Sequence, residues 1–389
     1  MGGEQIHCQI SSEMAVEIGH SVKIITTRHP RGLEYKQQKG INIYYLLNTR
    51  SARLSKSWWK ESVNKITQLH EDEPFDVIWA ENLAGYYYAW KIKPQLKIPI
   101  VSVMHQLGLL GHIVSEWNRI SSFKEIISFS AKHLPEALLF YIPWFFRTLK
   151  YSDAIVGVSD QTIEALRREF LVDENKLFVI YDGIDTELFK PDKAKREFIR
   201  KQFSINQEDK VILMAGVIHK QKGMHFGLRA FAQIRKQVQN CKLIVLGDGP
   251  HLEELKELAG ELDVDKDVIF CGLIPNDETA AYYNGCDLFL NPTVRQEGLA
   301  LVTLEAMSCA KPVVVSRIGG TQSTIDDGIS GFFVRPKDIE SITKKTIELL
   351  RNQTLSNRMG EKGREKVLIK FSREKMIADY LSISERLIK

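Results

Sequence analysis

The sequence has few cysteines, and no pairing pattern connects them. None of the five belongs to a CxxC pair of the kind that binds zinc or exchanges disulfides. They are Cys8, Cys241, Cys271, Cys286 and Cys309. All except Cys8 lie in or beside apolar runs, which indicates buried free thiols in a reducing compartment. We therefore expect a cytoplasmic protein.

A charge excess and a long apolar stretch are also lacking. The 53 basic and 49 acidic residues leave a net charge of +4, which does not mark a nucleic-acid-binding protein. No run of about 18 apolar residues is present, so no membrane span is predicted, and no signal peptide is visible. The acidic run at 263–267 lacks the glycine and the terminal glutamate of a calcium loop, so we expect no metal site there.

The nearest candidate for a membrane contact is the segment 137–146, ALLFYIPWFF. It is too short to span a bilayer, and Pro143 interrupts it. Two interpretations remain open. The favoured one is a buried helix pair. The other is peripheral contact of 137–147 with the cytosolic face of a membrane, where the protein would meet a lipid-linked acceptor.

Strand-like and helix-like runs alternate along the whole chain. Its 389 residues exceed what one hydrophobic core usually serves, so two doubly wound α/β domains are predicted. A charged, proline-containing stretch at 189–192 indicates the boundary, and 371–389 is typical of an amphipathic helix. The predicted strands are 21–27, 41–46, 77–80, 100–104, 154–158, 211–215, 243–246, 268–271, 288–290, 313–316 and 331–334.

The strongest functional signal is the segment 295–307, RQEGLALVTLEAM, which follows the predicted strand 288–290. It carries two glutamates, Glu297 and Glu305, and Gly298 permits a tight turn before a helix that starts near Leu299. The first turn of a helix presents unpaired N–H groups and a partial positive charge. A diphosphate suits such a site.

A second signal is the basic loop 216–223, which follows the predicted strand 211–215. A strand that leads into a basic, glycine-closed loop is typical of a phosphate site, and Lys222 can neutralise a departing diphosphate. The turn Gly247-Asp248-Gly249-Pro250 follows another strand, but Leu252 occupies the place of the third glycine of a dinucleotide fingerprint. A nicotinamide cofactor is therefore not expected.

Together these segments resemble the retaining nucleotide-sugar glycosyltransferases of family 4, over nearly the whole chain. The family's GxxxxxKG loop, GDGP turn, EGFGL…E segment and PVV…GG turn correspond to 216–223, 247–250, 297–305 and 312–320. The resemblance implies the GT-B fold, with two Rossmann-like parallel-sheet domains and a cleft between them. The expected parts are an acceptor-side domain at 1–188, a donor-binding domain at 189–370 and a helix at 371–389 that packs back on the first domain.

The resemblance also implies roles for individual residues. The catalytic residues would be Glu297, His105 and Lys222: Glu297 and His105 contact the donor sugar, and Lys222 neutralises the diphosphate. Glu305 would hold the ribose hydroxyls, and Gly2 and Gly3 would form an acceptor-side loop. The donor-binding set would be Gly216, Lys222, Gly223, Gly298, Leu299, Ala300, Leu301 and Glu305.

The implied partners are a nucleotide-diphosphate sugar as co-substrate and an unidentified acceptor, which is a carbohydrate, a lipid-linked molecule or a small molecule, with no cofactor and no metal. Four positions depart from the family pattern: Val217 replaces an arginine, Ala300 a glycine, Ser323 a glutamate and Asp182 an asparagine. Two alternatives stay open. One is a sugar-nucleotide epimerase of the same fold, and the other is a sugar-binding scaffold without catalysis, which Val217 and Ser323 make plausible.

The first residues also differ from the family, whose members begin with an apolar strand before the Gly-Gly turn. Here Gly2 and Gly3 follow Met1 directly, and a helix at 4–18 is predicted at once. Because that strand lies in the middle of a doubly wound sheet, we expect a further segment of roughly 10–20 residues upstream, with one strand and a loop. The alternative is a truncated protein that has lost acceptor binding.

Overall fold

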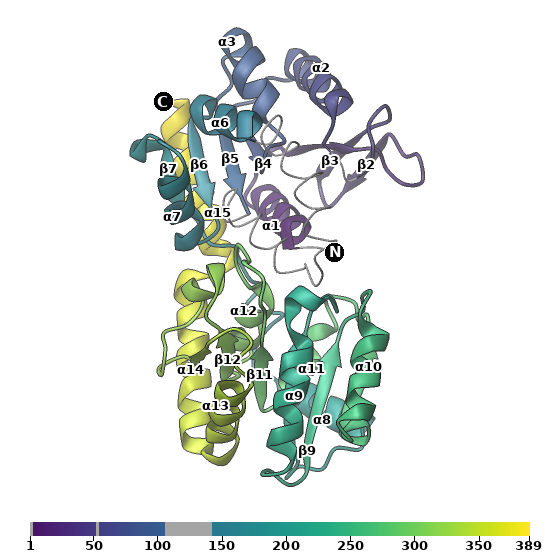
Figure 1. Ribbon diagram of the computed structural model, residues 1–389. Coiled ribbons are helices and arrows are strands. Elements are labelled where there is room, and N and C mark those ends of the chain that lie inside the picture. The colour runs from purple at the N-terminus through teal and green to yellow at the C-terminus, as the bar shows by residue number, and fades with distance from the viewer. Residues whose placement is uncertain (1–2, 52–53, 106–141) are drawn as a thin grey trace, which may run out of the picture. The chain divides into compact units, whose positions relative to one another are not determined.

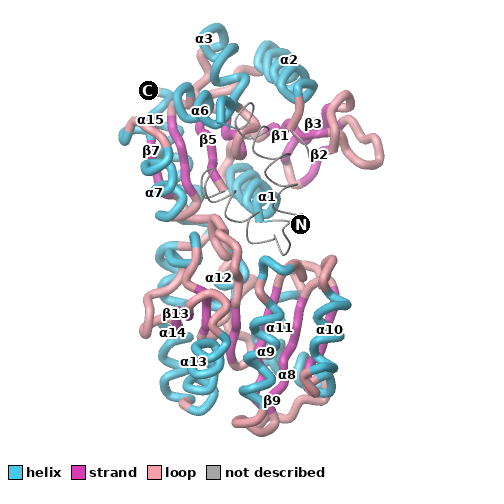
Figure 2. Tube along the Cα trace, in the orientation of Figure 1, coloured by secondary structure: helices cyan, strands magenta, loops and turns pink. Residues whose placement is uncertain are grey.

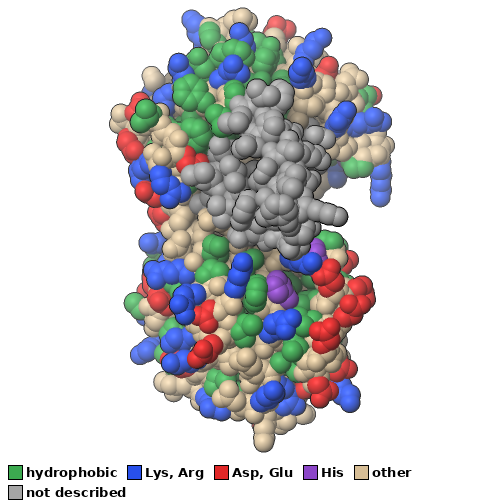
Figure 3. Space-filling view, in the orientation of Figure 1, with side chains coloured by type: hydrophobic (Ala, Val, Ile, Leu, Met, Phe, Trp, Pro, Cys, Tyr) green, Lys and Arg blue, Asp and Glu red, His purple; other side chains and the backbone are tan. Residues whose placement is uncertain are grey.

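The computed structural model describes residues 3–51, 54–105 and 142–389, which form two compact α/β units (Figure 1). Unit 1 comprises the described residues up to Gly183 together with Arg373–Lys389, and unit 2 comprises Ile184–Ser372. In the described part of the chain no helix is long and apolar enough to cross a membrane. Basic and acidic side chains both occur on the visible face of each unit, as the near balance of charge predicts (Figure 3).

Unit 2 is built on one parallel sheet of six strands in the order β10-β9-β8-β11-β12-β13 (Figure 2). Strands β11 and β12 are buried along their whole length, and β9 is buried except at Lys242, because helices cover both faces of such a sheet. The order reverses between β8 and β11, which pair through Leu288 with Ile212 and Phe289 with Leu213. The strands are β8 (Lys210–Ala215), β9 (Cys241–Leu246), β10 (Val268–Gly272), β11 (Leu288–Asn291), β12 (Val313–Ser316) and β13 (Phe332–Val334).

Among the helices of unit 2, α9 packs against α10 and α13, and α8 packs against α11. Helix α12 contacts α11 and α14, and α14 also contacts α13. Side-chain caps fix where several of them begin. Asp192, for example, accepts a hydrogen bond from the backbone N–H of Lys195 at the start of α8, at 3.0 Å. The helices are α8 (Lys193–Gln202), α9 (Met224–Arg235), α10 (Leu252–Glu261), α11 (Thr279–Gly285), α12 (Leu301–Ser308), α13 (Ile339–Arg351) and α14 (Gln353–Lys370).

The described strands of unit 1 form two sheets. A parallel sheet has the order β4-β5-β6-β7, and a smaller one has the order β1-β3-β2 with β2 antiparallel. Among the described residues, β1 pairs only with β3 and β4 only with β5. The strands are β1 (Lys23–Thr27), β2 (Tyr35–Gln38), β3 (Ile41–Leu46), β4 (Ile78–Glu81), β5 (Ile100–Met104), β6 (Ala154–Gly157) and β7 (Leu177–Val179).

The terminal helix α15 (Arg373–Ile388) belongs to unit 1 and packs against α1 (Gly3–Glu17). Ile377 of α15 contacts Met14 and Ala15 of α1 in one apolar cluster. The Trp79 indole also donates a hydrogen bond to the Ser384 hydroxyl at 3.0 Å. The remaining described helices of unit 1 are α2 (Lys56–Asp72), the π-helical turn Tyr88–Ile92, α3 (Lys93–Leu96), α6 (Ile142–Tyr151), α7 (Asp160–Glu169) and the 3₁₀ turn Glu174–Lys176.

Every predicted strand overlaps an observed one, but the sequence reading missed β2 and β7. All four residues of β2 are exposed, so this edge strand carries no apolar signal, and β7 is three residues long. The apolar segment 137–147 lies partly outside the described residues. Its described part belongs to α6, where Phe145 is buried and Phe146 is half exposed.

Two helical glycines provide a test of the packing in unit 2. A Cβ built at Gly360 of α14 would lie 2.1 Å from the carbonyl oxygen of Ala310, whereas one at Gly260 of α10 meets nothing within 4 Å. We expect Gly360→Ala to lower the free energy of unfolding by about 1–3 kcal/mol through overpacking. The matched change Gly260→Ala should raise it by about 0.5–1 kcal/mol, because alanine restricts the unfolded chain. Calorimetric melting of both variants measures the difference. Equal melting temperatures would contradict the packing described.

Candidate active site

The loops after β8 and β11 meet at the point where the strand order of unit 2 reverses. The backbone N–H of Val294 donates to the carbonyl oxygen of Gln221 at 2.9 Å, and the hydroxyl oxygen of Thr293 lies 3.2 Å from the same oxygen. A Cβ at Gly223, whose φ is +67°, would lie 2.0 Å from the carbonyl oxygen of Pro292. Ligands of open α/β sheets bind at this kind of switch point, beyond the carboxyl ends of the strands.

Glycines also bring the loops after β9 and β12 to the same edge of the sheet. A Cβ at Gly247, whose φ is +129°, would lie 2.0 Å from the carbonyl oxygen of Gly216. A Cβ at Gly320 would lie 1.6 Å from the carbonyl oxygen of Gly298. The backbone N–H of Gly320 also donates to the backbone carbonyl oxygen of Glu297 at 2.7 Å. The four glycine motifs of the sequence are therefore loops in backbone contact, and larger side chains would push them apart.

An ion pair joins the loops after β8 and β11. Nζ of Lys222 lies 2.7 Å from Oε1 of Glu297, and the hydroxyl of Thr293 donates to the same oxygen at 3.0 Å. Lys222 ends the 3₁₀ turn Lys220–Lys222, and its side chain keeps 23% exposure. Because the ammonium and the carboxylate neutralise each other here, an anion that binds Lys222 has to compete with Glu297.

Glu305 is buried on α12 close to this pair of loops. The hydroxyl of Tyr283, on α11, donates a hydrogen bond to Oε2 of Glu305 at 2.6 Å. Burial raises the pKa of Glu305 to about 7, although the hydrogen bond from Tyr283 lowers it. Burial also raises the pKa of Tyr283 well above its usual range, so this phenol stays a donor. The Glu305 carboxyl therefore changes charge near neutral pH.

Helix α12 begins at Leu301, two residues later than predicted. Ala300 is its N-cap and supplies no side-chain hydrogen bond, because alanine has no acceptor. Leu299 and Ala300 thus belong to the loop rather than to the first helical turn. The uncapped end still directs backbone N–H groups away from the helix, next to Gly298.

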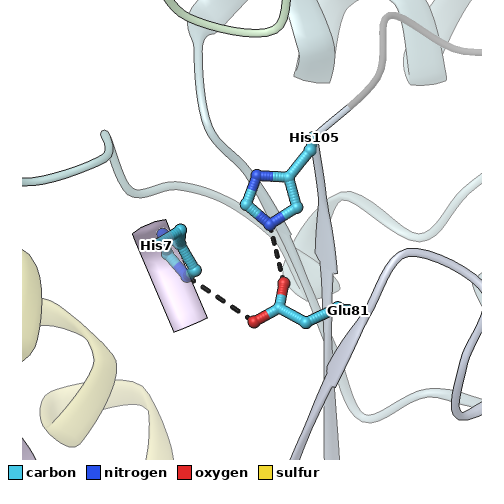
Figure 4. Close-up of side chains that lie close together, drawn as sticks. All are labelled: His7, Glu81 and His105. Atoms are coloured by element: carbon cyan, nitrogen blue, oxygen red, sulfur yellow. Dashed lines mark hydrogen bonds and ion pairs between the residues drawn. The ribbon is translucent and has the colours of Figure 1, made fainter. Parts of the chain in front are cut away.

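A separate polar cluster lies in unit 1, at the carboxyl ends of β4 and β5 (Figure 4). Nε2 of His105, directly after β5, lies 2.6 Å from Oε2 of Glu81, the last residue of β4. Oε1 of Glu81 lies 3.9 Å from Nε2 of His7 on α1, whose Nδ1 lies 2.7 Å from Oδ1 of Asp182. His7 and Asp182 are buried, and Glu81 and His105 are partly exposed.

His7, Glu81 and His105 place ligand atoms within 4.8 Å of one another, which a metal ion would require. The 2.6 Å between Nε2 of His105 and Oε2 of Glu81 is a hydrogen-bond distance. Two ligands on one tetrahedral zinc ion stand about 3.3 Å apart. The arrangement is therefore that of a hydrogen-bonded acid–imidazole pair.

The structure divides the predicted site residues between the two units. Those of unit 2 surround the ends of β8 and β11: Gly216, Lys222, Gly223, Glu297, Gly298, Leu299, Ala300, Leu301 and Glu305. His105 belongs to unit 1, where Gly3 is the first residue of α1, and Gly2 lies outside the described residues.

Sequence reasoning missed Tyr283, Glu81 and His7, and it noticed Asp182 only as a departure from a family pattern. Glu81 could have been found, since it ends a strand in the same way that His105 follows one. Tyr283 and His7 carry no such signal, because only the packing of their helices brings them to a carboxylate.

Comparison with known proteins decides the family. The family model for glycosyl transferases group 1 matches residues 195–366, and the model for Glycosyltransferase Family 4 matches residues 1–188. The chain is a family 4 glycosyltransferase. An uncharacterized glycosyltransferase of Methanocaldococcus jannaschii is 28% identical to it over 88% of this chain and 83% of that protein. The N-acetyl-alpha-D-glucosaminyl L-malate synthase of Bacillus anthracis is 25% identical over 98% of this chain and 93% of that protein.

Solved structures show the same fold for this glycosyltransferase. A sucrose-phosphate synthase from Thermosynechococcus elongatus superposes with a TM-score of 0.80 at 20% identity, over 99% of this chain and 94% of that one. The Anabaena protein Alr3699/HepE, in complex with UDP, superposes with a TM-score of 0.79 at 18% identity, over 99% and 96%. The glycosyltransferase has the GT-B fold with two Rossmann-like units, as predicted.

The contact between Tyr283 and Glu305 makes a prediction about protonation. Because the phenol lowers the pKa of Glu305, Tyr283→Phe should raise it further above about 7. Carbon-13 NMR of labelled glutamate carboxyls across pH 5–9 measures the midpoint. Tyr282→Phe removes the neighbouring hydroxyl and serves as the control. An unchanged midpoint for Glu305 in Tyr283→Phe would show that the hydrogen bond does not form.

The same carboxyl should affect stability. Its pKa is raised from 4.5 to about 7 in the fold, so folding favours the protonated form. The contribution of Glu305 to the free energy of unfolding is fully present below pH 4.5 and is lost as the pH rises through 7. Glu305→Gln should remove this part of the pH dependence.

Proposed function

We propose that this glycosyltransferase moves a sugar from a nucleotide-diphosphate sugar to a carbohydrate or lipid-linked acceptor, without a metal and with retention of configuration. The observation that carries the proposal is the pair of Lys222 and Glu297 at the β8–β11 switch point, beside the uncapped start of α12. A cation, helix amides and a carboxylate at one place suit a diphosphate joined to a sugar. Retention rests on the family resemblance alone.

The chemistry explains why such a set is needed. Transfer breaks the bond between the anomeric carbon and the diphosphate, so negative charge grows on the leaving phosphate and positive charge on the sugar. Lys222 and the N–H groups near Gly298 and Leu301 offset the first charge in place of a metal. Glu297 contacts the donor sugar, and Glu305 holds the ribose hydroxyls.

On this account, Lys222 changes its partner when the donor binds. Lys222 gives up its contact with Glu297 to reach the diphosphate, which leaves the carboxylate to the sugar. Ribose hydroxyls are donors that suit an ionised Glu305, so nucleotide affinity should increase as the pH rises through about 7. His105 in turn donates a hydrogen bond to a substrate oxygen.

Relatives support the nature of the donor. Solved structures of the Anabaena protein contain UDP and UDP-glucose. Our proposal for the present chain is the broader class, a nucleotide-diphosphate sugar. The direct test incubates the full chain with UDP-, GDP- and ADP-sugars and acceptor extracts and measures release of the nucleotide diphosphate. Donor binding without release under any of these conditions would favour a sugar-binding scaffold instead.

Variants at the ion pair separate binding from turnover. Lys222→Ala should weaken binding of the nucleotide diphosphate by about 10- to 100-fold, since a charge-assisted contact is lost. Lys220→Ala is the matched control, because Lys220 pairs with Glu254 at the surface instead. Glu297→Gln should increase the affinity for the nucleotide diphosphate, because Lys222 loses its competing partner. The same change should lower turnover by about a hundredfold.

Isothermal calorimetry gives the affinities for these variants, and initial rates give the turnover. The site assignment fails if Lys222→Ala and Lys220→Ala bind the diphosphate equally well and Glu297→Gln turns over normally.

Metal removal is an independent test. Because Lys222 and the amides at α12 supply the positive charge, we expect full transferase activity in excess EDTA. Initial rates before and after chelation measure this. An activity lost in EDTA and restored by manganese or magnesium would mean that a metal, rather than Lys222, meets the diphosphate.

A further inference from the structure

The ring of His105 is held from one side. Its Nε2 lies 2.6 Å from Oε2 of Glu81, and its backbone N–H donates to Oδ1 of Asn82 at 3.1 Å. The side chain is only 9% exposed, so the ring has little room to turn. Among the residues that the structure describes, none is bonded to the other ring nitrogen, Nδ1.

Glu81 is in turn part of a row of alternating acids and imidazoles. From Asp182 the row passes to His7, then to Glu81 and His105, with separations of 2.7, 3.9 and 2.6 Å between the facing atoms. The hydroxyl of Tyr380, on α15, lies 3.3 Å from Nε2 of His7. The row thus joins α1, β4, β5, the segment after β7 and α15, so each side chain is placed by a different element.

A carboxylate on one nitrogen of an imidazole has two consequences. It selects the tautomer that carries hydrogen on that nitrogen, and it stabilises the imidazolium form. For His105 this means that Nε2–H points to Glu81. The protonated ring then presents Nδ1–H as its second donor.

We propose that Glu81 is a positioning residue, which keeps His105 cationic and oriented so that its Nδ1–H donates a hydrogen bond to a substrate oxygen. His7 lies 3.9 Å from the other oxygen of Glu81, which is beyond hydrogen-bond distance, so the assignment rests on the contact between Glu81 and His105. The inference rests on the proposed role of His105 in transfer, but its structural part concerns the free protein and is tested without substrate.

The charges around His105 agree with this assignment. Burial lowers the pKa of His105, but the hydrogen bond to Glu81 and the charges of Asp182, Glu81 and Glu4 outweigh it and raise the pKa to about 9. His7 on α1 contacts the ring edge-on, and Glu81 on β4 bonds to it. The charges of Asp182 after β7 and Glu4 on α1 also act on it, whereas Tyr380 on α15 contacts His7 instead. At neutral pH the imidazolium is therefore the main form.

The test combines NMR titration with pH–rate profiles on the full chain. In Glu81→Gln the amide keeps the shape but not the charge, so the NMR midpoint of His105 should fall from about 9 to below about 7.5. Transfer at pH 8 should fall by about fourfold or more and recover as the pH is lowered and His105 is protonated again. Glu73→Gln is the matched control, since Glu73 pairs with Lys23 at the surface of the same unit and is not among the charges that act on the ring. It should change both readouts little.

The outcomes separate this inference from the proposed function. A His105 midpoint that stays near 9 in Glu81→Gln, or a rate loss that acid does not restore, overturns the positioning role. If His105→Ala itself transfers sugar at the normal rate, the role of His105 in catalysis fails, and with it the inference, while the donor site of unit 2 stands. If Glu81→Gln does not fold, Glu81→Asp retains the charge at a longer distance, and an unchanged midpoint there would overturn the proposal.

Discussion

The candidate donor site depends on backbone contacts that only glycine permits. Gly223 lies against Pro292, Gly247 against Gly216 and Gly320 against Gly298, each with no space for a Cβ. These contacts draw four loops from separate strands to one edge of the sheet. The ion pair of Lys222 and Glu297 follows from them, because its two residues lie on loops that the glycines hold together. The glycine motifs are thus needed first to let the backbones of the four loops approach one another, and only then to bind a ligand.

Much of unit 2 could be predicted from sequence because its strands are short, apolar and buried on both faces. The glycine motifs lie directly after β8, β9, β11 and β12, so strand prediction also placed the loops at a common edge. The partners of the site residues could not be predicted in the same way. Tyr283 reaches Glu305 from α11, and that contact depends on how two helices pack rather than on any local pattern.

Parts of unit 1 could not be predicted from sequence patterns. Its second sheet includes β2, whose residues are all exposed, and the apolar alternation that reveals a half-buried strand is missing there. The acid–imidazole row was hidden for a related reason. His7, Glu81, His105 and Asp182 are far apart in the sequence, and each alone resembles an ordinary polar residue. The rule that strand ends carry function selected His105 and would have selected Glu81 one strand earlier. It would not have selected His7.

The central claim is that the nucleotide sugar binds in unit 2, at the carboxyl ends of β8 and β11. Hydrogen exchange measured by mass spectrometry on the full chain, with and without UDP-, GDP- or ADP-glucose, tests this most directly. The account predicts that a bound nucleotide sugar protects backbone amides in 216–223 and 293–301, because the N–H groups near Gly298 and Leu301 would bind the diphosphate and the ligand would cover both loops. A nucleotide sugar that binds and leaves both loops exchanging at their original rates would contradict it.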